Sequence, residues 1–369
     1  MSNVDPWQFD LEGYLREAEP DAAERADAWQ TGIGLQAVDG LPVSDYLLGT
    51  AKEHIEGNIT IDEAQRRIAD YYQTREGRHD LEDEDTREGD IVSGRIAQFL
   101  GERAFTFSPV QLQTIHRRLF DQLLAHAGKY RTYNITKKEW VLKGDTVYYA
   151  SYDSIEDTLR YDFAQEQEFD YSGLSATDVA RHIARFVSDV WQIHPFGEGN
   201  TRTTAVFAIK YLRTMGYEVN NDPYRDHSWY FRNALVRANY EDVSRGIAPT
   251  TIYLERFFQN QLCGTRHELK NRYLHLDWPQ RETQQVTQQV TQQDTDQVTD
   301  QVTDQVRALL AALGDAELSA RVLMDRLGLS HRPTFRQNYL NPALAAGLIE
   351  RTIPDKPTSR LQRYRRARR

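Results

Sequence analysis

Two amphipathic helices separated by a short glycine-rich loop constrain this chain more than any other feature of its sequence. Residues 175–192 begin at Ser175, with Asp178 three positions later as in a capping box, and their apolar side chains recur at helical spacing. Residues 200–215 form a second such stretch, and Gly216 is a typical helix stop. Both stretches are long and strongly periodic, so they predict core helices.

A third helix and one β-hairpin are predicted in the same domain. Residues 109–127 follow Ser108-Pro109, an N-cap with proline at the first helical position, and run to Gly128. Residues 140–152 contain two runs of β-forming side chains around Gly144-Asp145, a pattern typical of a hairpin. The predicted fold class is therefore mainly α, with a hairpin attached to the helical core.

Length and composition narrow the class of protein. A chain of 369 residues suggests about two to three domains. Its one cysteine, Cys263, cannot form an internal disulfide or a cysteine-based metal site. The sequence contains no apolar run of the ~18 residues that a membrane span needs, and its first residues do not resemble a signal peptide. We therefore expect a cytoplasmic protein with no membrane partner.

Two stretches of biased composition indicate domain boundaries. Residues 78–90 hold seven carboxylates and one apolar residue, which predicts an exposed connection. Residues 283–306 form a tetrad repeat of Gln, Thr, Asp and Val, which favours a solvated linker, with a weak helix near its end as the alternative. We accordingly expect an N-terminal helical region at 1–89, a catalytic domain at 90–265, a linker at 266–306 and a small domain at 307–369.

The loop His194-Pro195-Phe196-Gly197-Glu198-Gly199-Asn200-Thr201-Arg202 carries the candidate chemistry. Its glycines allow close approach of the backbone, and the free N–H groups of the next helix favour an anion. Glu198 suits a Mg²⁺ ion shared with phosphate oxygens, and Arg202 can donate to the same phosphates. The ordinary pKa of histidine, ~6.5, suits His194 to take a proton from a hydroxyl. Taken singly each residue has a plain structural explanation, but nine such residues in sequence indicate a phosphate site.

The same nine residues resemble the signature of the Fic (filamentation induced by cAMP) family, whose pattern is His-x-Phe-x-Asp/Glu-Gly-Asn-x-Arg-x-x-Arg. The resemblance covers about residues 90–260 and implies a helical core that transfers AMP from ATP, with Mg²⁺, to a Ser, Thr or Tyr hydroxyl of a protein, itself included. It implies His194 as the base, Phe196 as a core anchor and Glu198 as the Mg²⁺ ligand. The implied nucleotide-binding residues of the loop are Gly197, Glu198, Gly199, Asn200, Thr201 and Arg202. The second arginine of the pattern, which holds the γ-phosphate in the family, is Ala205 here.

Two further segments resemble parts of the family's substrate site. The hairpin resembles the flap that aligns the target, and its implied docking residues are Lys143, Val147, Tyr148 and Tyr149. Such a flap adds the target as a strand through backbone hydrogen bonds. The stretch WYFRNALVRANY resembles the helix that lines the adenine pocket, which points to Tyr230, Phe231 and Asn239.

An N-terminal segment resembles the family's inhibitory helix, a Ser/Thr-x-x-x-Glu-Gly/Asn motif that lies against the nucleotide site. Residues 44–57 end in Ile55-Glu56-Gly57, and Glu56 takes the place of the inhibitory carboxylate. Lys52 stands where the family has a hydroxyl. Because Ala205 replaces the carboxylate's usual partner, we expect Glu56 either to be exposed and to inhibit poorly or to pair with Arg202, and we favour the pairing. A plain helix stop at Gly57 explains the same residues without inhibition.

The C-terminal residues 307–369 resemble a winged helix, with three short helices followed by two strands. They carry 12 Arg and one Lys against three Asp and two Glu, a net charge of +8 in a chain whose total is −10. DNA binding through phosphate contacts is one prediction, and protein docking or homodimerisation is the other.

Three hypotheses for the whole chain follow. The first is a protein adenylyltransferase restrained in cis. The second is a DNA-binding regulator whose Fic-like domain senses nucleotide without transfer, which the Ala205 substitution favours. The third is transfer of a different nucleotide or of a phosphate by the same site.

Overall fold

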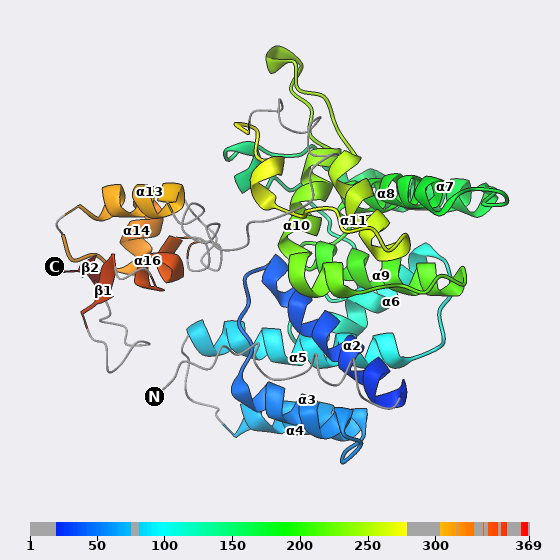
Figure 1. Cartoon of the computed structure of the whole chain (residues 1–369), viewed down its shortest axis with the longest axis horizontal. Helices are drawn as coiled ribbons and strands as arrows, with labels where there is room; N and C mark the ends of the chain where they lie inside the picture. Colours follow the sequence, from blue (N-terminus) through cyan, green and yellow to red (C-terminus); the bar gives the residue numbers. More distant parts are fainter. Residues whose placement is uncertain are drawn as a thin grey trace. The chain divides into compact units, whose positions relative to one another are not determined.

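The computed structural model describes residues 20–74, 81–278, 303–314, 316–327, 335, 339–345, 348–352 and 363–367. Residues 283–302 of the predicted tetrad-repeat linker lie outside them, and residues 303–306 begin the helix α13 (Thr303–Leu313) rather than a linker. The chain divides into two compact units (Figure 1). The first comprises residues 1–38, 42–77 and 85–278, and the second comprises 39–41, 78–84 and 279–369.

Helices build the first unit, as the sequence predicts. They are α2 (Pro20–Gly34), α3 (Asp45–Ile55), α4 (Ile61–Gln73), α5 (Leu81–Gly101), α6 (Pro109–Phe120), α7 (Ile155–Glu168), α8 (Ala176–Ile193), α9 (Asn200–Thr214), α10 (Asp222–Ala238) and α11 (Ile252–Leu262). Short 3-10 turns join them: η2 (Leu35–Val38), η3 (Trp140–Leu142), η4 (Tyr152–Ser154), η5 (Val243–Arg245) and η6 (Asn271–Leu274). None of the helices described here is long and apolar enough to cross a membrane.

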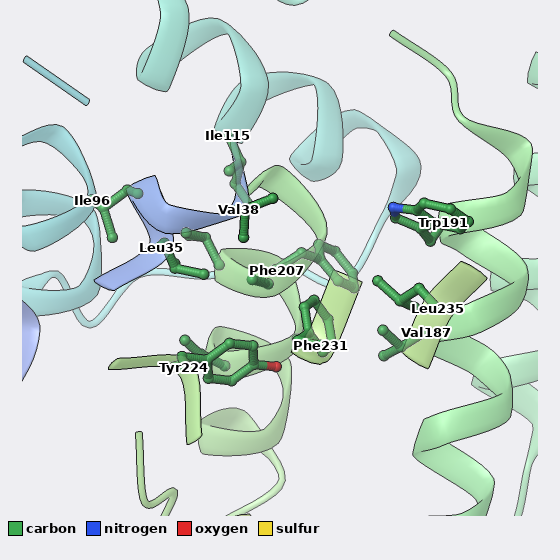
Figure 2. Packing of buried hydrophobic residues seen from close by; sticks show 14 of the residues in the cluster. Leu35, Val38, Ile96, Ile115, Val187, Trp191, Phe207, Tyr224, Phe231 and Leu235 are labelled. Atoms are coloured by element: carbon green, nitrogen blue, oxygen red, sulfur yellow. The ribbon is translucent and has the colours of Figure 1, made fainter. Parts of the chain in front are cut away.

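The two helices that the sequence singles out lie at the centre of this unit. α8 packs on α7, α9 and α11, and α9 packs on α6 and η2. Ser175 caps α8 by accepting a hydrogen bond from the N–H of Asp178, which confirms the predicted start. Val187 and Trp191 of α8 and Phe207 of α9 belong to the same buried cluster (Figure 2). The motif loop therefore leaves and enters helices that the core holds rigidly.

α6 is shorter than predicted. It ends at Phe120 rather than near residue 127, because Asp121 has extended backbone angles and Gln122 is left-handed, with φ of 60°. The guanidinium of Arg95 donates to the carbonyls of Leu119 and Asp121, at 3.0 and 2.8 Å, and so satisfies the end of the helix.

The acidic stretch 78–90 is not the exposed connection that its composition predicts. From Leu81 it forms the first half of α5. Asp90 is fully buried and accepts hydrogen bonds from the N–H and hydroxyl of Ser44 and from the hydroxyl of Tyr72. Tertiary partners from other helices thus stabilise carboxylates that composition alone assigns to solvent.

The predicted hairpin at 140–152 is also wrong in detail. Residues 140–142 form the 3-10 turn η3, and Lys143 and Gly144 are left-handed, with φ of 60° and 88°. The Glu139 N–H donates to the Asp145 carbonyl at 2.8 Å, which closes a tight loop. Residues 146–151 then run outside any strand ladder towards the end of α8.

Residues 266–278, predicted as the start of the linker, belong to the first unit. The guanidinium of Arg237 in α10 donates to the carbonyl of Leu274 at 2.6 Å. The N–H of Leu276 donates to the carbonyl of Val141 at 3.1 Å. These bonds attach the segment to α10 and to η3.

The second unit contains α13 (Thr303–Leu313), α14 (Ala320–Arg326), α16 (Asn341–Ala345), β1 (Ile349–Arg351) and β2 (Tyr364–Arg366). The strands are antiparallel, with Glu350 opposite Arg365. Leu318, between α13 and α14, forms an antiparallel bridge with Tyr364. From the sequence, the third of the short C-terminal helices is expected to begin at Ser330, which lies outside the described residues. Two helices and two strands are therefore found where the sequence predicts them.

Candidate active site

α8 ends at Ile193, and the C-cap residue His194 has a left-handed backbone, with φ of 50° and ψ of 58°. This conformation is rare for a residue with a side chain, and it turns the chain sharply out of the helix. The N–H of His194 still donates to the carbonyl of Trp191 at 3.0 Å. The motif loop therefore starts at a strained residue that the end of α8 holds in place.

The imidazole of His194 is in the tautomer that a general base needs. Its Nδ1 lies 3.2 Å from the carbonyl oxygen of Trp191, which can only accept, so Nδ1 carries the proton. Nε2 then carries the lone pair, and it is buried with no hydrogen-bond partner among the described residues. Burial, followed by the nearby cations Lys137, Arg232 and Arg131, lowers the pKa of His194 well below its usual range.

Tyr149 covers this histidine. The two ring centroids are 4.2 Å apart, and His194 is only 2% exposed. The hydroxyl of Tyr149 donates to the carboxylate of Glu139, which also forms an ion pair with Arg232 of α10. The segment predicted as a flap thus lies over the catalytic candidate, and in this structure the site is closed.

Asn200 shapes the motif loop. Its side-chain oxygen accepts from the Phe196 N–H at 2.9 Å, and its amide nitrogen donates to the Phe196 carbonyl at 2.7 Å. Gly199 is left-handed, with φ of 70°, and a Cβ there would lie 2.4 Å from Phe120. The loop therefore requires glycine at 199 and an amide at 200 for its own geometry.

The loop leads into a helix N-terminus suited to an anion. Gly199 is the N-cap of α9 and supplies no side-chain cap, so the first N–H groups of the helix are not capped from that residue. The hydroxyl of Thr201 accepts from the indole N–H of Trp191 at 3.0 Å, so Thr201 joins α9 to α8. The side chains of Asn200 and Thr201 already hydrogen-bond within the protein, so the backbone N–H groups of 197–202 are the better candidates to bind phosphate.

His116 of α6 holds the middle of the loop. The N–H of Gly128 donates to its Nδ1 at 2.8 Å, so its Nε2 carries the proton and lies 3.0 Å from the carbonyl oxygen of Glu198. Its ring stacks on that of Phe196, with centroids 3.8 Å apart. Burial lowers the pKa of His116 to about 4, which keeps the ring neutral in this role.

Arg202 is enclosed rather than open to solvent. Its guanidinium donates to the Gln36 side chain at 3.0 Å and to the carboxylate of Glu88 at 2.7 Å, and it lies over the ring of Phe120. Arg202 is 3% exposed. Gln36 of η2 and Glu88 of α5 thus accept hydrogen bonds from the arginine that the sequence predicts to bind phosphate.

Glu198 is exposed at the tip of the loop, beside the N-terminus of α9. No group of three or more His, Cys, Asp or Glu side chains suited to a metal occurs among the described residues. A single carboxylate fits Mg²⁺, which proteins often hold through one or two carboxylates together with substrate phosphates. Glu198 is therefore compatible with a metal that arrives with a nucleotide.

Glu56 is not where the inhibitory hypothesis needs it. It is the C-cap of α3, is exposed, and lies 3.7 Å from Lys52 and 3.1 Å from the amide of Asn58. The predicted pairing of Glu56 with Arg202 is wrong, because Arg202 forms its ion pair with Glu88. Ala205 is fully buried, so the missing second arginine leaves a packed position on α9.

Two of the three predicted adenine-pocket residues are core residues. Phe231 is fully buried beside Tyr224 (Figure 2), and Tyr230 donates its hydroxyl to the carbonyl of Tyr253. Both side chains are thus packed in the core with almost no exposed surface. Asn239 ends α10 and donates to the hydroxyl of Ser188 at 2.8 Å.

The predicted docking residues of the flap separate into two groups. Lys143 is exposed and pairs with Asp277 at 2.9 Å, whereas Val147 is buried. Tyr148 is 81% exposed, and its carbonyl accepts from the Gln192 side chain in the last turn of α8. Of the four predicted docking residues, Lys143 and Tyr148 are therefore exposed, Tyr149 is half-buried over His194, and Val147 is buried.

Sequence reasoning missed four residues of the site: Gln36, Glu88, His116 and Arg131. Each reaches the loop from a helix or segment more than 60 positions away in the chain. Among these four, only Glu88 lies in a stretch with a marked sequence pattern, the acidic residues 78–90, and that pattern predicts exposure to solvent rather than a place in the site.

Comparison with known proteins agrees with this geometry. Residues 106–212 match the family model described as the Fic/DOC family, and residues 304–367 match that of the filamentation induced by cAMP protein Fic-like C-terminal domain. The protein adenylyltransferase VbhT of Bartonella schoenbuchensis is 26% identical over 175 residues, which cover 46% of this chain and 35% of that protein. The match thus spans about a third of the curated relative.

Solved structures of low similarity carry the same domain name. A Fic family protein from Desulfovibrio desulfuricans G20 is 22% identical, with a TM-score of 0.39, over 97% of this chain and 93% of that one. The N-terminal FIC domain of Bep8 from Bartonella sp. 1-1C is 17% identical, with a TM-score of 0.38, over 48% of this chain and 86% of that one.

The helical core and the loop between α8 and α9 define a Fic-type domain, to which a small C-terminal domain is attached. Residues 106–212 therefore match the Fic/DOC family, and residues 304–367 match the Fic-like C-terminal domain.

Proposed function

We propose that this protein transfers AMP from ATP to a hydroxyl of a protein side chain. The observation that supports this most directly is the state of His194, whose Nε2 is a buried lone pair beside a loop built for an anion. The acceptor hydroxyl gives its proton to Nε2, and its oxygen forms a bond to the α-phosphorus. The bond from that phosphorus to the β-phosphate oxygen breaks, and pyrophosphate leaves.

Different groups of the protein bind the phosphates, hold the metal and keep the loop in shape. The backbone N–H groups from Gly197 to Arg202 stabilise phosphate oxygens. Glu198 is the residue that would hold Mg²⁺, which when bound neutralises charge on the phosphates. Asn200 and His116 keep the loop in shape through their bonds to Phe196 and Glu198. Opening of the segment that carries Tyr149 admits the acceptor.

A restraint in cis is part of the proposal, through Glu88 and Gln36 rather than Glu56. A carboxylate bound to the motif arginine competes with phosphate for the same guanidinium, because both ligands use its forked donors. Charge-assisted pairs of this kind contribute about 1.5–3 kcal/mol, or roughly ten- to a hundred-fold in affinity.

Labelled ATP tests the activity. The full chain is incubated with Mg²⁺ and either α-labelled or γ-labelled ATP, and protein-bound label is measured after denaturing electrophoresis. We expect α-label only, with a loss of about 10²–10⁴-fold in His194→Ala. His267→Ala, at an exposed histidine, is the matched control. Label from γ-labelled ATP would instead support phosphate transfer, and no label from either would support nucleotide sensing without transfer.

A second candidate function concerns the C-terminal domain. The bridge between Leu318 and Tyr364 and the β1–β2 pair are arranged as in the sheet of a winged helix. Arg321, Arg351 and Arg363 are exposed in a segment of net charge +8. We propose that this domain contacts DNA phosphates.

A further inference from the structure

One buried arginine, Arg131, hydrogen-bonds both to the end of α8 and to the segment that covers His194. Arg131 lies between α6 and η3 in the sequence, outside the motif, and is only 4% exposed. Its Nε donates to the carbonyl of His194 at 2.8 Å, and its terminal nitrogens donate to the carbonyls of Ile193 at 3.2 Å and Tyr133 at 2.8 Å. A further bond runs to the carbonyl of Ala150.

The backbone of the same residue adds a fifth contact. The N–H of Arg131 donates to the carbonyl of Pro195 at 2.8 Å. Arg131 therefore binds three consecutive carbonyls, those of residues 193, 194 and 195, and also the residue that follows Tyr149. A single side chain links the end of α8, the start of the motif loop and the segment that covers His194.

These carbonyls need such a partner. The last carbonyls of a helix have no intrahelical donor, and the partial negative charge at a helix C-terminus favours a cation. His194 also has a left-handed backbone, which costs about 1–2 kcal/mol for a residue with a side chain. A planar guanidinium can satisfy several carbonyls at fixed angles, which a lysine ammonium cannot reproduce.

We infer that Arg131 is the positioning residue of the site: by holding the carbonyls around His194 it sets the direction in which Nε2 points, and it couples that direction to the covering segment. The inference rests on the proposed function, because it assigns Arg131 a role in the step that His194 performs. Arg131 donates only to backbone carbonyls, so it acts through His194 and does not itself touch the reacting atoms.

Loss of Arg131 should affect His194 in two measurable ways. A misplaced base lowers the rate of the chemical step, and a displacement of about 1 Å can cost on the order of 10²-fold. The groups around His194 are Lys137 and Glu139 before η3, Tyr149 of the covering segment, Trp191 of α8 and Arg232 of α10. Removing one nearby cation and loosening the burial both raise the pKa of His194 towards its ordinary value.

The test compares Arg131→Met, which removes the charge and the planar set of N–H donors, with Arg131→Lys, which keeps only the charge. Arg237→Met is the matched control, since Arg237 is also buried and also donates to a backbone carbonyl, that of Leu274, outside the motif loop. The rate of single-turnover self-labelling is measured from pH 5 to 9 at saturating Mg²⁺ and ATP. The KM for ATP is measured separately by varying the ATP concentration. Histidine ring signals are titrated by NMR, and His194→Ala assigns the signal of His194.

We expect Arg131→Met to lower the labelling rate by about 10- to 100-fold with KM changed less than about threefold. Its His194 signal should titrate at higher pH than in the wild type, and Arg131→Lys should recover the pKa more than the rate. Arg237→Met should lose stability without either change. An unmoved His194 titration and rate in folded Arg131→Met would overturn the inference.

The titration also separates the inference from the proposed function. If the wild type transfers no label, the proposed function fails, while the NMR comparison still decides whether Arg131 governs His194. If Arg131→Met does not fold, the Nε–H of Arg131 in the wild type provides the measurement. A resolved and slowly exchanging signal supports the bond to His194, and rapid exchange contradicts it.

Discussion

The guanidinium of Arg202 lies 2.7 Å from the carboxylate of Glu88, and this pair encloses the arginine of the motif at the start of α9. The two residues are 114 positions apart in the chain. α5, which carries Glu88, begins in a stretch that composition assigns to solvent, so the most consequential ion pair of the site is one that no local pattern indicates.

Neutralising Glu88 should release Arg202. We expect Glu88→Gln to raise α-label transfer by roughly ten- to a hundred-fold at ATP concentrations below KM, because phosphate no longer competes with a carboxylate. The measurement is initial labelling rate against ATP concentration. Glu84→Gln, at an exposed residue one turn earlier on α5, and Glu56→Gln are the controls and should change little. Equal or lower activity in Glu88→Gln would remove the cis restraint.

Alanine at Gly199 should disrupt the loop. The added Cβ meets Phe120 at 2.4 Å and must adopt φ of 70°, whereas at Gly216 the same left-handed strain occurs, with φ of 86°, and nothing lies within 4 Å. Gly216→Ala should therefore cost about 1–2 kcal/mol of unfolding free energy, and Gly199→Ala distinctly more, with loss of labelling. Denaturant unfolding of both variants gives the comparison. Similar losses would contradict the role of Phe120.

Acid should destabilise the fold through His116. Its pKa is about 4 when folded and ~6.5 when unfolded, so between these values the unfolded chain binds more protons and stability falls as pH falls. At pH 5 the loss relative to pH 8 is about 2 kcal/mol from this residue alone. Unfolding of the wild type and of His116→Gln at both pH values checks this prediction. The variant should be less stable at pH 8 and less sensitive to pH, and an unchanged pH dependence would be evidence against it.

An arginine at position 205 should not restore the complete family motif. Ala205 is fully buried on α9, so Ala205→Arg forces a large cation into packed surroundings, at a cost of several kcal/mol. We expect a lower melting temperature and no gain in ATP binding, measured by calorimetry. Ala205→Ser, a small change at the same place, is the control. A stable variant that binds ATP more tightly would show that the position faces the nucleotide.

DNA binding should depend steeply on salt. If the C-terminal domain neutralises several phosphates, the logarithm of affinity falls linearly with the logarithm of salt concentration, with a slope of about −0.9 per phosphate. Fluorescence anisotropy of a labelled duplex with the full chain measures this. Arg321→Gln, at an exposed arginine of α14, should reduce the slope by about one phosphate if that residue contacts DNA. Binding that is absent at low salt would leave docking or dimerisation as the domain's role.

Local signals predicted the helices and the loop well, since the information lies within a few residues. Ser175 with Asp178, Ser108 with Pro109, and Gly216 each specify a helix end through bonds that span three or four positions. The hairpin failed because the left-handed Lys143 and Gly144 close a tight loop around η3. β-forming side chains alone do not establish strand pairing.

The sequence by itself therefore determined the helical class, the motif loop with His194 at its head, and the separate basic domain. Only the tertiary structure decided that Glu88 and Gln36 enclose Arg202, that Arg131 holds the carbonyls of His194, and that Phe231 belongs to the core. The reason is distance along the chain. A helix cap is a bond between near neighbours, whereas the partners of a buried charge come from whichever distant segments pack around it, and burial makes those partners obligatory.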